Sequence, residues 1–168
     1  AIEKVEIEKK LMQHSNAISF RLATVFGMSP RMRIDLLVND FTYRAVNDGF
    51  VVLFESHFKR NYIHVRDVSR VFQHAINNHE NMKGEIYNVG LSDANVSKKE
   101  LCQHIQKQLP NFIYIDEQIR KDPDQRNYIV SNEKIEATGF RTEFSLDLGI
   151  RELIKGYTMI NNSQYGNV

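Results

Sequence analysis

Two adjacent cations, Lys59 and Arg60, stand directly before a short run of β-forming residues at positions 62–65. An arginine guanidinium is a planar fork of N–H donors that suits phosphate or carboxylate groups. We expect the pair to project from a loop at the end of a strand, where it could bind an anionic ligand. The alternative is two solvated surface charges, the usual situation of such residues.

Asp67 is the other polar residue of this stretch, and apolar residues recur at helical spacing after it: Val68, Val71, Phe72, Ala75 and Ile76. This spacing predicts a helix over residues 67–76 with Asp67 as its N-cap. A structural cap is therefore the favoured interpretation of Asp67, ahead of an acid catalyst.

The length and composition are those of a single globular domain. The chain has 168 residues, 42% of them hydrophobic and 26% charged, with a net charge of +1. With 22 basic and 21 acidic residues there is no basic field to attract a nucleic acid. Cys102 is the only cysteine, which excludes an internal disulfide and a multi-cysteine zinc site. His74 and His79, the nearest histidine pair, lack the i, i+4 spacing of a helical metal site.

Membrane and secretory signals are absent from the pattern. No apolar run approaches the roughly 18 residues of a spanning helix, and the first residues form a charged amphipathic stretch unlike a signal peptide. The sequence favours a cytoplasmic protein without a membrane partner.

Helical and extended patterns alternate along the chain. Apolar spacing predicts helices over residues 1–14, 34–48, 97–109, 132–138 and from 145 to 157, in addition to 67–76. Ser97 and Glu100 form a capping box. Strands are expected at 17–23, 50–54, 62–65, 85–89 and 112–115, with a short extended piece at 127–130. Residues 28–33 and 77–83 read as loops and the tail from 161 as polar. This alternation predicts an α/β or α+β fold with one core. The first predicted helix has no start signal. We therefore expect these residues to belong to a longer protein.

Four blocks of sequence resemble one family. They are Lys-Val-Glu-Ile-Glu-Lys at 4–9, Arg-Leu-Ala-Thr-Val-Phe-Gly at 21–27, Arg-Asn-Tyr-Ile-His-Val-Arg-Asp at 60–67 and Tyr-Asn-Val-Gly at 87–90. Their order and spacing resemble extended short-chain dehydrogenases of the nucleotide-sugar epimerase and dehydratase type. The resemblance implies an α/β fold, the C-terminal part of a Rossmann-type enzyme. Residues 1–27 would end the dinucleotide-binding domain and residues 28–168 would form mainly the substrate-binding domain, with segments around 62–90 returning to the Rossmann part.

The resemblance implies that Lys4 is the catalytic and cofactor-binding lysine of a Tyr-x-x-x-Lys pair whose tyrosine stands just before Ala1. Four residues apart on a helix, the two side chains share a face, so the ammonium can lower the pKa of the phenol and hold the nicotinamide ribose. The tyrosinate would then take a proton from a sugar hydroxyl. Glu3 departs from the commoner Ser or Thr, and an exposed helix lysine is the alternative for Lys4.

Five residues are implied as substrate contacts. Arg60 corresponds to an arginine that holds the substrate diphosphate, and Arg126, preferred over Arg120, corresponds to a second one. Asn39 matches a region near the sugar or base, and Arg33, like Arg31, belongs to a loop that covers the substrate. Thr24 stands where many relatives have Asn facing the sugar. Asn88 and Gly90 are expected to be structural.

The implied function is an NAD-dependent epimerase or dehydratase that acts on a nucleotide-diphosphate sugar through a transient keto-sugar, with NADP as the alternative cofactor. No G-x-G-x-x-G occurs, so these 168 residues alone are expected to be inactive. The full-length protein is expected to form a homodimer. Two alternatives stay open: a non-catalytic nucleotide-sugar or NAD-binding relative, and a keto-sugar reductase. A tyrosine encoded upstream of Ala1 would favour the enzyme.

Overall fold

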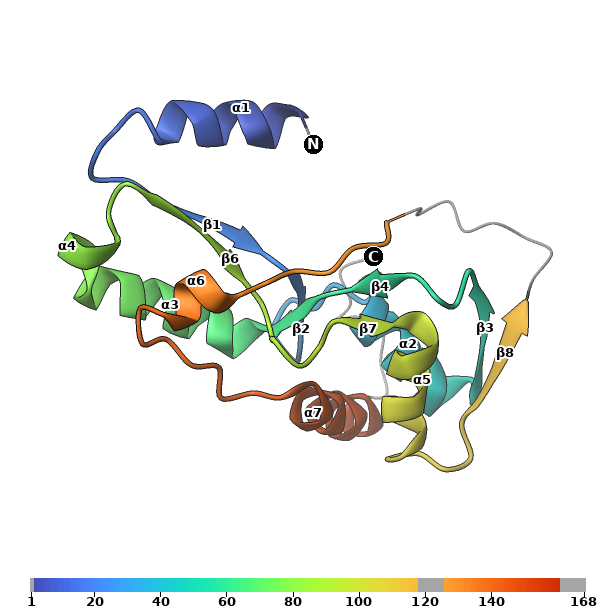
Figure 1. Cartoon of the computed structure of the whole chain (residues 1–168). Coiled ribbons are helices and arrows are strands. Elements are labelled where there is room, and N and C mark those ends of the chain that lie inside the picture. The colour runs from blue at the N-terminus through green and yellow to red at the C-terminus, as the bar shows by residue number, and fades with distance from the viewer. Residues whose placement is uncertain (1, 118–125, 161–168) are drawn as a thin grey trace.

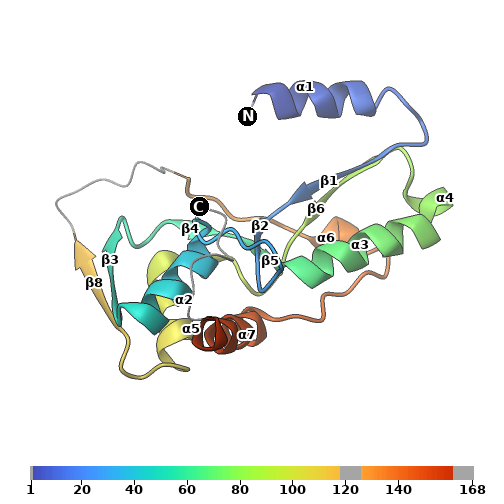
Figure 2. The same ribbon diagram turned by 180° about the vertical axis from the view of Figure 1, so that it is seen from behind.

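A computed structural model describes residues 2–117 and 126–160, shown from two sides in Figures 1 and 2. The helices are α1 (Ile2–Leu11), α2 (Leu37–Asn47), α3 (Val65–Asn77), α4 (His79–Met82), α5 (Lys98–Gln106), α6 (Glu133–Glu136) and α7 (Leu146–Met159). The strands are β1 (Ile18–Leu22), β2 (Thr24–Phe26), β3 (Phe50–Phe54), β4 (Lys59–Arg60), β5 (Tyr62–His64), β6 (Glu85–Val89), β7 (Val96–Ser97) and β8 (Ile113–Glu117).

The described strands form four pairs. β1 pairs with β6, β2 with β5 and β3 with β8, all parallel, whereas β4 and β7 are antiparallel. Parallel partners need a crossover connection, and at least one helix lies between the members of each parallel pair in the sequence. The chain is therefore an α/β protein with short parallel sheet pieces, which confirms the predicted fold class.

Two clusters of buried apolar side chains hold these elements together. The larger cluster joins β2, α2, β3, α5 and α7, and includes Phe26, Val38, Leu53, Leu101 and Ile150. The smaller one joins β5, α3, β6 and α6, and includes Ile63, Val71, Tyr87, Val89 and Ile135. In Figure 1, α2, β3 and α5 lie towards one end of the molecule and α3, β6 and α6 towards the other, with β2 between them.

Helix α1 stands apart from both clusters (Figures 1 and 2). It has no buried residue, and its apolar side chains Ile2 and Ile7 are 80% and 65% exposed. Polar contacts connect it to β1: the Glu8 carboxylate accepts hydrogen bonds from the guanidinium of Arg21 at 2.6 and 2.9 Å and from the Ser19 hydroxyl at 3.2 Å.

Helix α3 begins two residues earlier than predicted, and the predicted capping role of Asp67 is wrong. The N-cap is His64, whose Nδ1 accepts a hydrogen bond from the backbone N–H of Arg66 at 3.3 Å. Asp67 lies in the first helical turn. A histidine ring nitrogen can replace the usual Asp or Ser oxygen at a helix start, so the preference for Asp as a cap misplaced the boundary.

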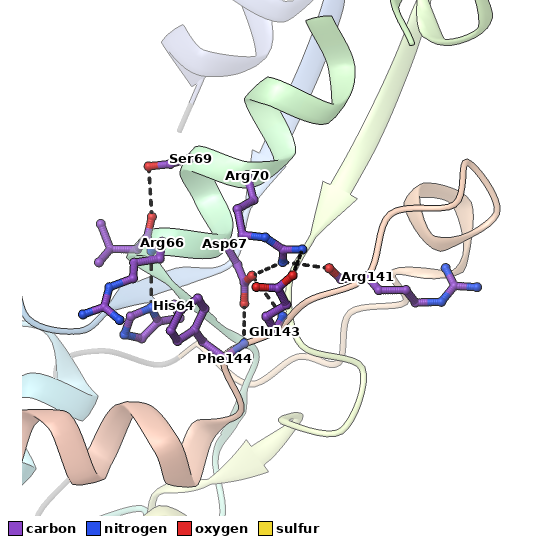
Figure 3. A network of polar contacts seen from close by, with 9 residues as sticks. His64, Arg66, Asp67, Ser69, Arg70, Arg141, Glu143 and Phe144 are labelled. Carbon is purple, nitrogen blue, oxygen red and sulfur yellow. Dashed lines mark hydrogen bonds and ion pairs between the residues drawn. The ribbon is translucent and has the colours of Figure 1, made fainter. Parts of the chain in front are cut away.

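Asp67 is nevertheless structural, as Figure 3 shows. Its buried carboxylate accepts hydrogen bonds from the backbone N–H groups of Glu143 and Phe144, both at 3.0 Å. Arg70 donates to the same carboxylate at 2.7 Å and reaches the Glu143 carboxylate at 2.5 Å. The side chain thus ties α3 to the segment that leads into α7.

Other boundaries agree or differ for local reasons. The capping box before α5 is confirmed: the Ser97 hydroxyl accepts from the Glu100 N–H at 3.1 Å, and the Glu100 carboxylate accepts from the Ser97 N–H at 2.6 Å. Helix α7 begins at Leu146, next to the predicted start at residue 145, and the Ser145 hydroxyl caps it by accepting from the Leu148 N–H at 3.2 Å.

Residues 79–82 were expected to be part of a loop, but they form α4. Arg120 and the tail from 161 lie outside the described residues.

The expectation that Lys59 and Arg60 lie in a loop is wrong. They form β4, in which Lys59 pairs with Ser97 and Arg60 with Val96. Residues 127–130 are not assigned as a strand, although the Tyr128 N–H donates to the Lys59 carbonyl at 3.0 Å. Neither partner segment is near in the sequence, so the local pattern contained no indication of these pairings.

Candidate functional site

One cavity, of about 670 Å³, collects the residues that the sequence singled out as substrate contacts. Its lining includes Thr24, Arg33, Asn39, Arg60 and Arg126. A volume between about 300 and 1,000 Å³ is typical of small-molecule sites in proteins. We call it the arginine cavity, because the guanidinium-bearing residues Arg31, Arg33, Arg60 and Arg126 all line it.

Two hydrogen bonds bring two of these arginines to the same cavity from positions 66 residues apart in the sequence. The Lys59 N–H donates to the Asn127 Oδ1 at 2.9 Å, and the Tyr128 N–H donates to the Lys59 carbonyl. These bonds hold residues 126–128 alongside β4. Arg126 therefore lines the same cavity as Arg60, which directly follows Lys59.

Strand β2 supplies part of the cavity lining. Thr24 pairs with Tyr62 of β5, and the chain continues through Phe26 to Gly27, where the lining turns into the loop of residues 28–33. Gly27 has φ +118°, in the region that favours glycine, and a Cβ there would lie 2.5 Å from the Nε2 of His64. The loop departs at a point where only glycine fits.

Asn39 lies under this loop and is 3% exposed. Its Oδ1 accepts a hydrogen bond from the Gly27 N–H at 3.1 Å, and its Nδ2 donates to the Arg33 carbonyl at 3.0 Å. The side-chain amide thus contacts the backbone at both ends of the loop.

The lining is strongly cationic. It contains four arginines and one carboxylate, Asp35, which receives a bidentate interaction from Arg33 at 2.7 and 2.5 Å. The bonded Arg33 guanidinium lowers the pKa of Asp35 below its usual value, so this pair stays ionised at neutral pH. Arg60 is only 5% exposed, so its positive charge is largely shielded from solvent.

Helix α2 adds to this positive field. Its N-cap, Leu36, offers no side-chain cap, and both Leu36 and the first helical residue, Leu37, line the cavity. The first N–H groups of a helix carry a partial positive charge and attract anions. The arrangement can bind a ligand with more than one negative charge.

Lys4 is placed elsewhere. It is exposed on α1 and is not among the residues that line the arginine cavity. The described residues therefore bring together the implied substrate contacts and leave the implied catalytic lysine apart from them.

Two further residues have the structural positions expected of them. The Asn88 Nδ2 donates to the Ser131 carbonyl at 3.3 Å. A Cβ on Gly90 would overlap with the side-chain oxygen of the buried Asn61, so the backbone approaches this side chain closely. Asp35 and Tyr128 were missed as cavity residues. The only signal for them was their position two residues after Arg33 and Arg126.

Among the residues that the structure describes, no three His, Cys, Asp or Glu side chains are grouped so that they could hold a metal ion. The described helices are also too short or too polar to cross a membrane.

Comparison with known proteins identifies the family. The model of the NAD dependent epimerase/dehydratase family matches residues 4–90, slightly more than half of the chain. The chain therefore belongs to the NAD dependent epimerase/dehydratase family, as its four sequence blocks predicted.

Solved structures share the fold at low sequence identity. RMD from Pseudomonas aeruginosa, complexed with NADPH, has a TM-score of 0.78 and 15% identity, covering 94% of this chain and 55% of that one. The dTDP-glucose 4,6-dehydratase of Bacillus anthracis, complexed with NAD, has a TM-score of 0.74 and 18% identity, over 94% and 51% of the two chains.

The ADP-L-glycero-D-manno-heptose-6-epimerase of Helicobacter pylori is similar with a TM-score of 0.74 and 22% identity, over 95% of this chain and 51% of that one. The chain thus spans about half the length of the solved structures that it matches. At these identities the likeness establishes the fold.

Proposed function

We propose that this chain is the substrate-binding half of an NAD-dependent nucleotide-sugar epimerase or dehydratase. The observation that supports this most is the composition of the arginine cavity. Thr24, Arg33, Asn39, Arg60 and Arg126 were chosen from sequence alone, and they line one cavity although separate segments of the chain supply them. A random set of five polar residues would be scattered over the surface.

The charge of the cavity suits a nucleotide-diphosphate sugar. A diphosphate diester carries two negative charges, and Arg60 and Arg126 offer planar forks that can bind its oxygens in a bidentate manner. The start of α2 offers its first backbone N–H groups to the same anion. Arg33, which also binds Asp35, can then contact a phosphate or the sugar, and Thr24 can contact the sugar.

The domain division proposed from the sequence is supported by the pairing of β1 with β6. Residues 18–22, at the end of the proposed dinucleotide-binding part, lie parallel to residues 85–89. The segment after residue 62 thus returns to the sheet piece of the first 27 residues.

Lys4 is proposed as the catalytic lysine, four residues after a tyrosine that precedes this chain. Its exposure on α1, a helix without buried residues, leaves its ammonium accessible to a cofactor held by another part of the protein. Lys4 is the one residue for which we propose a contact with the cofactor, because a lysine ammonium can donate hydrogen bonds to ribose hydroxyls. When bound, NAD, or alternatively NADP, supplies an acceptor for hydride that can later be returned.

Each residue then has a distinct task. The Lys4 ammonium lowers the pKa of the neighbouring phenol, so that a phenolate can take a proton from a sugar hydroxyl. The arginines would hold the diphosphate and orient the sugar. Loss of the hydroxyl proton to the phenolate and of the hydride on the same carbon to the bound cofactor would leave a keto-sugar. An epimerase would return that hydride to the other face, and a dehydratase would return it after the keto-sugar has lost water.

The test is an assay of the full-length protein with NAD against a panel of nucleotide sugars. Arg60→Lys should raise KM about tenfold because the fork is lost, with kcat little changed. Arg151→Lys is the matched control, since Arg151 is exposed on α7 and outside the cavity lining.

Lys4→Met should instead lower kcat by a factor of about 10² to 10⁴, the usual range for loss of acid–base assistance. Lys10→Met, on the same helix, is its control. Absence of turnover and of binding across the panel would contradict the proposal, whereas tight binding without turnover would favour the non-catalytic relative.

A further inference from the structure

We propose that Asn39 is a positioning residue, which acts on the ligand through the loop of residues 28–33 by fixing Arg31 and Arg33 at the edge of the arginine cavity. The inference rests on the proposed function only in requiring an anionic ligand. It differs from the sequence expectation that Asn39 approaches the sugar or base itself.

The hydrogen bonds of Asn39 are the first observation. Its Oδ1 accepts from the Gly27 N–H at 3.1 Å and its Nδ2 donates to the Arg33 carbonyl at 3.0 Å. These two backbone groups are the entry and the exit of the loop. One side-chain amide therefore fixes the span of the loop, and a buried amide keeps such bonds because breaking them would leave unpaired polar groups.

The backbone of Asn39 is fixed in turn by α7. The Tyr157 hydroxyl donates to the Asn39 carbonyl at 3.2 Å, and Tyr157 is 6% exposed, with its ring edge-to-face on Tyr43 at 5.3 Å. The bond joins residues 118 positions apart. This hydrogen bond anchors the backbone of Asn39 to α7.

Helix α7 also supports the loop directly. A Cβ on Gly149 would overlap with the Phe26 ring, and one on Gly156 would overlap with the end of the Met28 side chain. These glycines are seven residues apart, so they lie on the same face of the helix. The residues on both sides of Gly27, Phe26 and Met28, therefore pack closely on α7, and Asn39 connects the two ends of the loop.

The result is a pre-organised pair of cations. Arg31 and Arg33 belong to the held loop and both line the cavity, and Arg33 is further oriented by its bidentate contact with Asp35. A loop that is already ordered loses less conformational entropy when an anion binds. Removing the Asn39 amide should therefore weaken anion binding without removing any group that touches the anion.

The experiment measures binding of inorganic pyrophosphate to the full-length protein by calorimetry at low salt. Asn39→Ala should weaken binding about tenfold, the size expected for loss of one or two buried hydrogen bonds. Asn47→Ala is the matched control, since Asn47 is on the same helix, is exposed and bonds its own helix at the Tyr43 carbonyl. It should leave the affinity unchanged.

A double-variant cycle separates positioning from a general structural effect. In a protein that already has Arg31→Ala and Arg33→Ala, the further change Asn39→Ala should have no effect on pyrophosphate affinity. A merely structural role would weaken binding by the same factor in both backgrounds, and that result would overturn the inference.

Tyr157→Phe provides a milder second variant should Asn39→Ala not fold. It removes only the hydroxyl that holds the Asn39 carbonyl, and it should weaken pyrophosphate binding about two- to threefold, again only when Arg31 and Arg33 are present. Unchanged affinity in both Asn39→Ala and Tyr157→Phe would overturn the inference.

The two proposals can fail separately. A wild-type protein that turns over a nucleotide sugar but does not bind pyrophosphate would contradict the positioning role and leave the proposed function in place. Coupling between Asn39 and the loop arginines in a protein without turnover of any nucleotide sugar would support the positioning role and contradict the enzyme.

Discussion

Gly27 is the residue with the least freedom to change in the cavity wall. Its φ of +118° is unfavourable for any side chain with a Cβ, and a Cβ would also lie 2.5 Å from the Nε2 of His64, a buried ring that packs edge-to-face on Phe26. Two separate costs, one of backbone conformation and one of overlap, apply at the same position.

Gly27→Ala should therefore lower the free energy of unfolding by about 2 to 4 kcal/mol, measured by urea denaturation. Gly139→Ala isolates the backbone cost, because Gly139 has φ +91° and no atom lies within 4 Å of the place that its new methyl group would take. It should cost about 1 kcal/mol. Equal losses in the two variants would mean that the His64 contact is unimportant.

His64 is a buried base whose pKa is subject to opposing influences, of which burial and the Glu152 carboxylate are the largest. Burial, the larger influence, lowers the pKa below the ordinary 6.5, and the carboxylate of Glu152, 3.3 Å from Nε2, raises it. Because the folded-state pKa is the lower one, the unfolded chain binds a proton first as the pH falls. Stability should therefore decrease as the pH falls below 6.5, until the folded-state pKa is reached.

An NMR titration of the ring should find the pKa of His64 below 6.5 in the native protein. Glu152→Gln should lower this pKa further, since it removes the carboxylate that favours the imidazolium. A pKa that rises in Glu152→Gln, or a native pKa above 6.5, would contradict this account of the site.

At the scale of elements, the N-terminal turn of α3 connects distant parts of the chain through Asp67. Its carboxylate is fully buried and accepts bonds from the backbone at Glu143 and Phe144 and from Arg70. In Figure 3 this residue lies between the helix and the segment that precedes α7. Removal of one acceptor leaves a buried donor without a partner, which costs more than the bond itself contributes.

Asp67→Asn should lower the free energy of unfolding by about 1 to 3 kcal/mol in chemical denaturation, because an amide provides one acceptor oxygen where the carboxylate provides two. Asp93→Asn, at an exposed position, removes the same charge and should change stability by less than about 0.5 kcal/mol. Similar losses in both would show that net charge, rather than the Asp67 bonds, sets the effect.

For the whole molecule, the position of α1 outside both apolar clusters has a direct consequence for stability. The helix has no buried residue, and its contacts with β1 include the ion pair of Glu8 with Arg21, in which the Arg21 side chain is 59% exposed. Exposed ion pairs contribute about 0 to 1 kcal/mol. Most of the folding free energy must come from the two clusters.

A protein that lacks residues 1–11 should therefore unfold cooperatively with a urea midpoint close to that of the intact chain. Replacing Leu101, which is fully buried in the larger cluster, with Ala is the contrasting variant and should cost about 2 to 5 kcal/mol. A large loss of stability on removal of α1 would mean that this helix packs on the remainder more closely than the structure shows.

Local features and the family could be read from the amino-acid sequence alone. The capping box at Ser97, the start of the last helix near residue 145 and the strands at 50–54 and 85–89 follow from preferences that act within a few residues. The blocks that identify the family are likewise contiguous stretches, so reading them required no knowledge of the fold.

Which residues meet one another depends on the tertiary structure. The pairing of β4 with β7, the bonds that hold Arg126 beside Arg60, and the contacts of Asp67 with residues 143 and 144 join segments separated by tens of residues. Hydrogen bonds of this kind depend on where the chain returns in space, and local propensities contain no information about that. For the same reason the hydrogen bonds of Asn39 to the Gly27 N–H and the Arg33 carbonyl could not be predicted from the sequence, in which Asn39 is expected only to be a substrate contact.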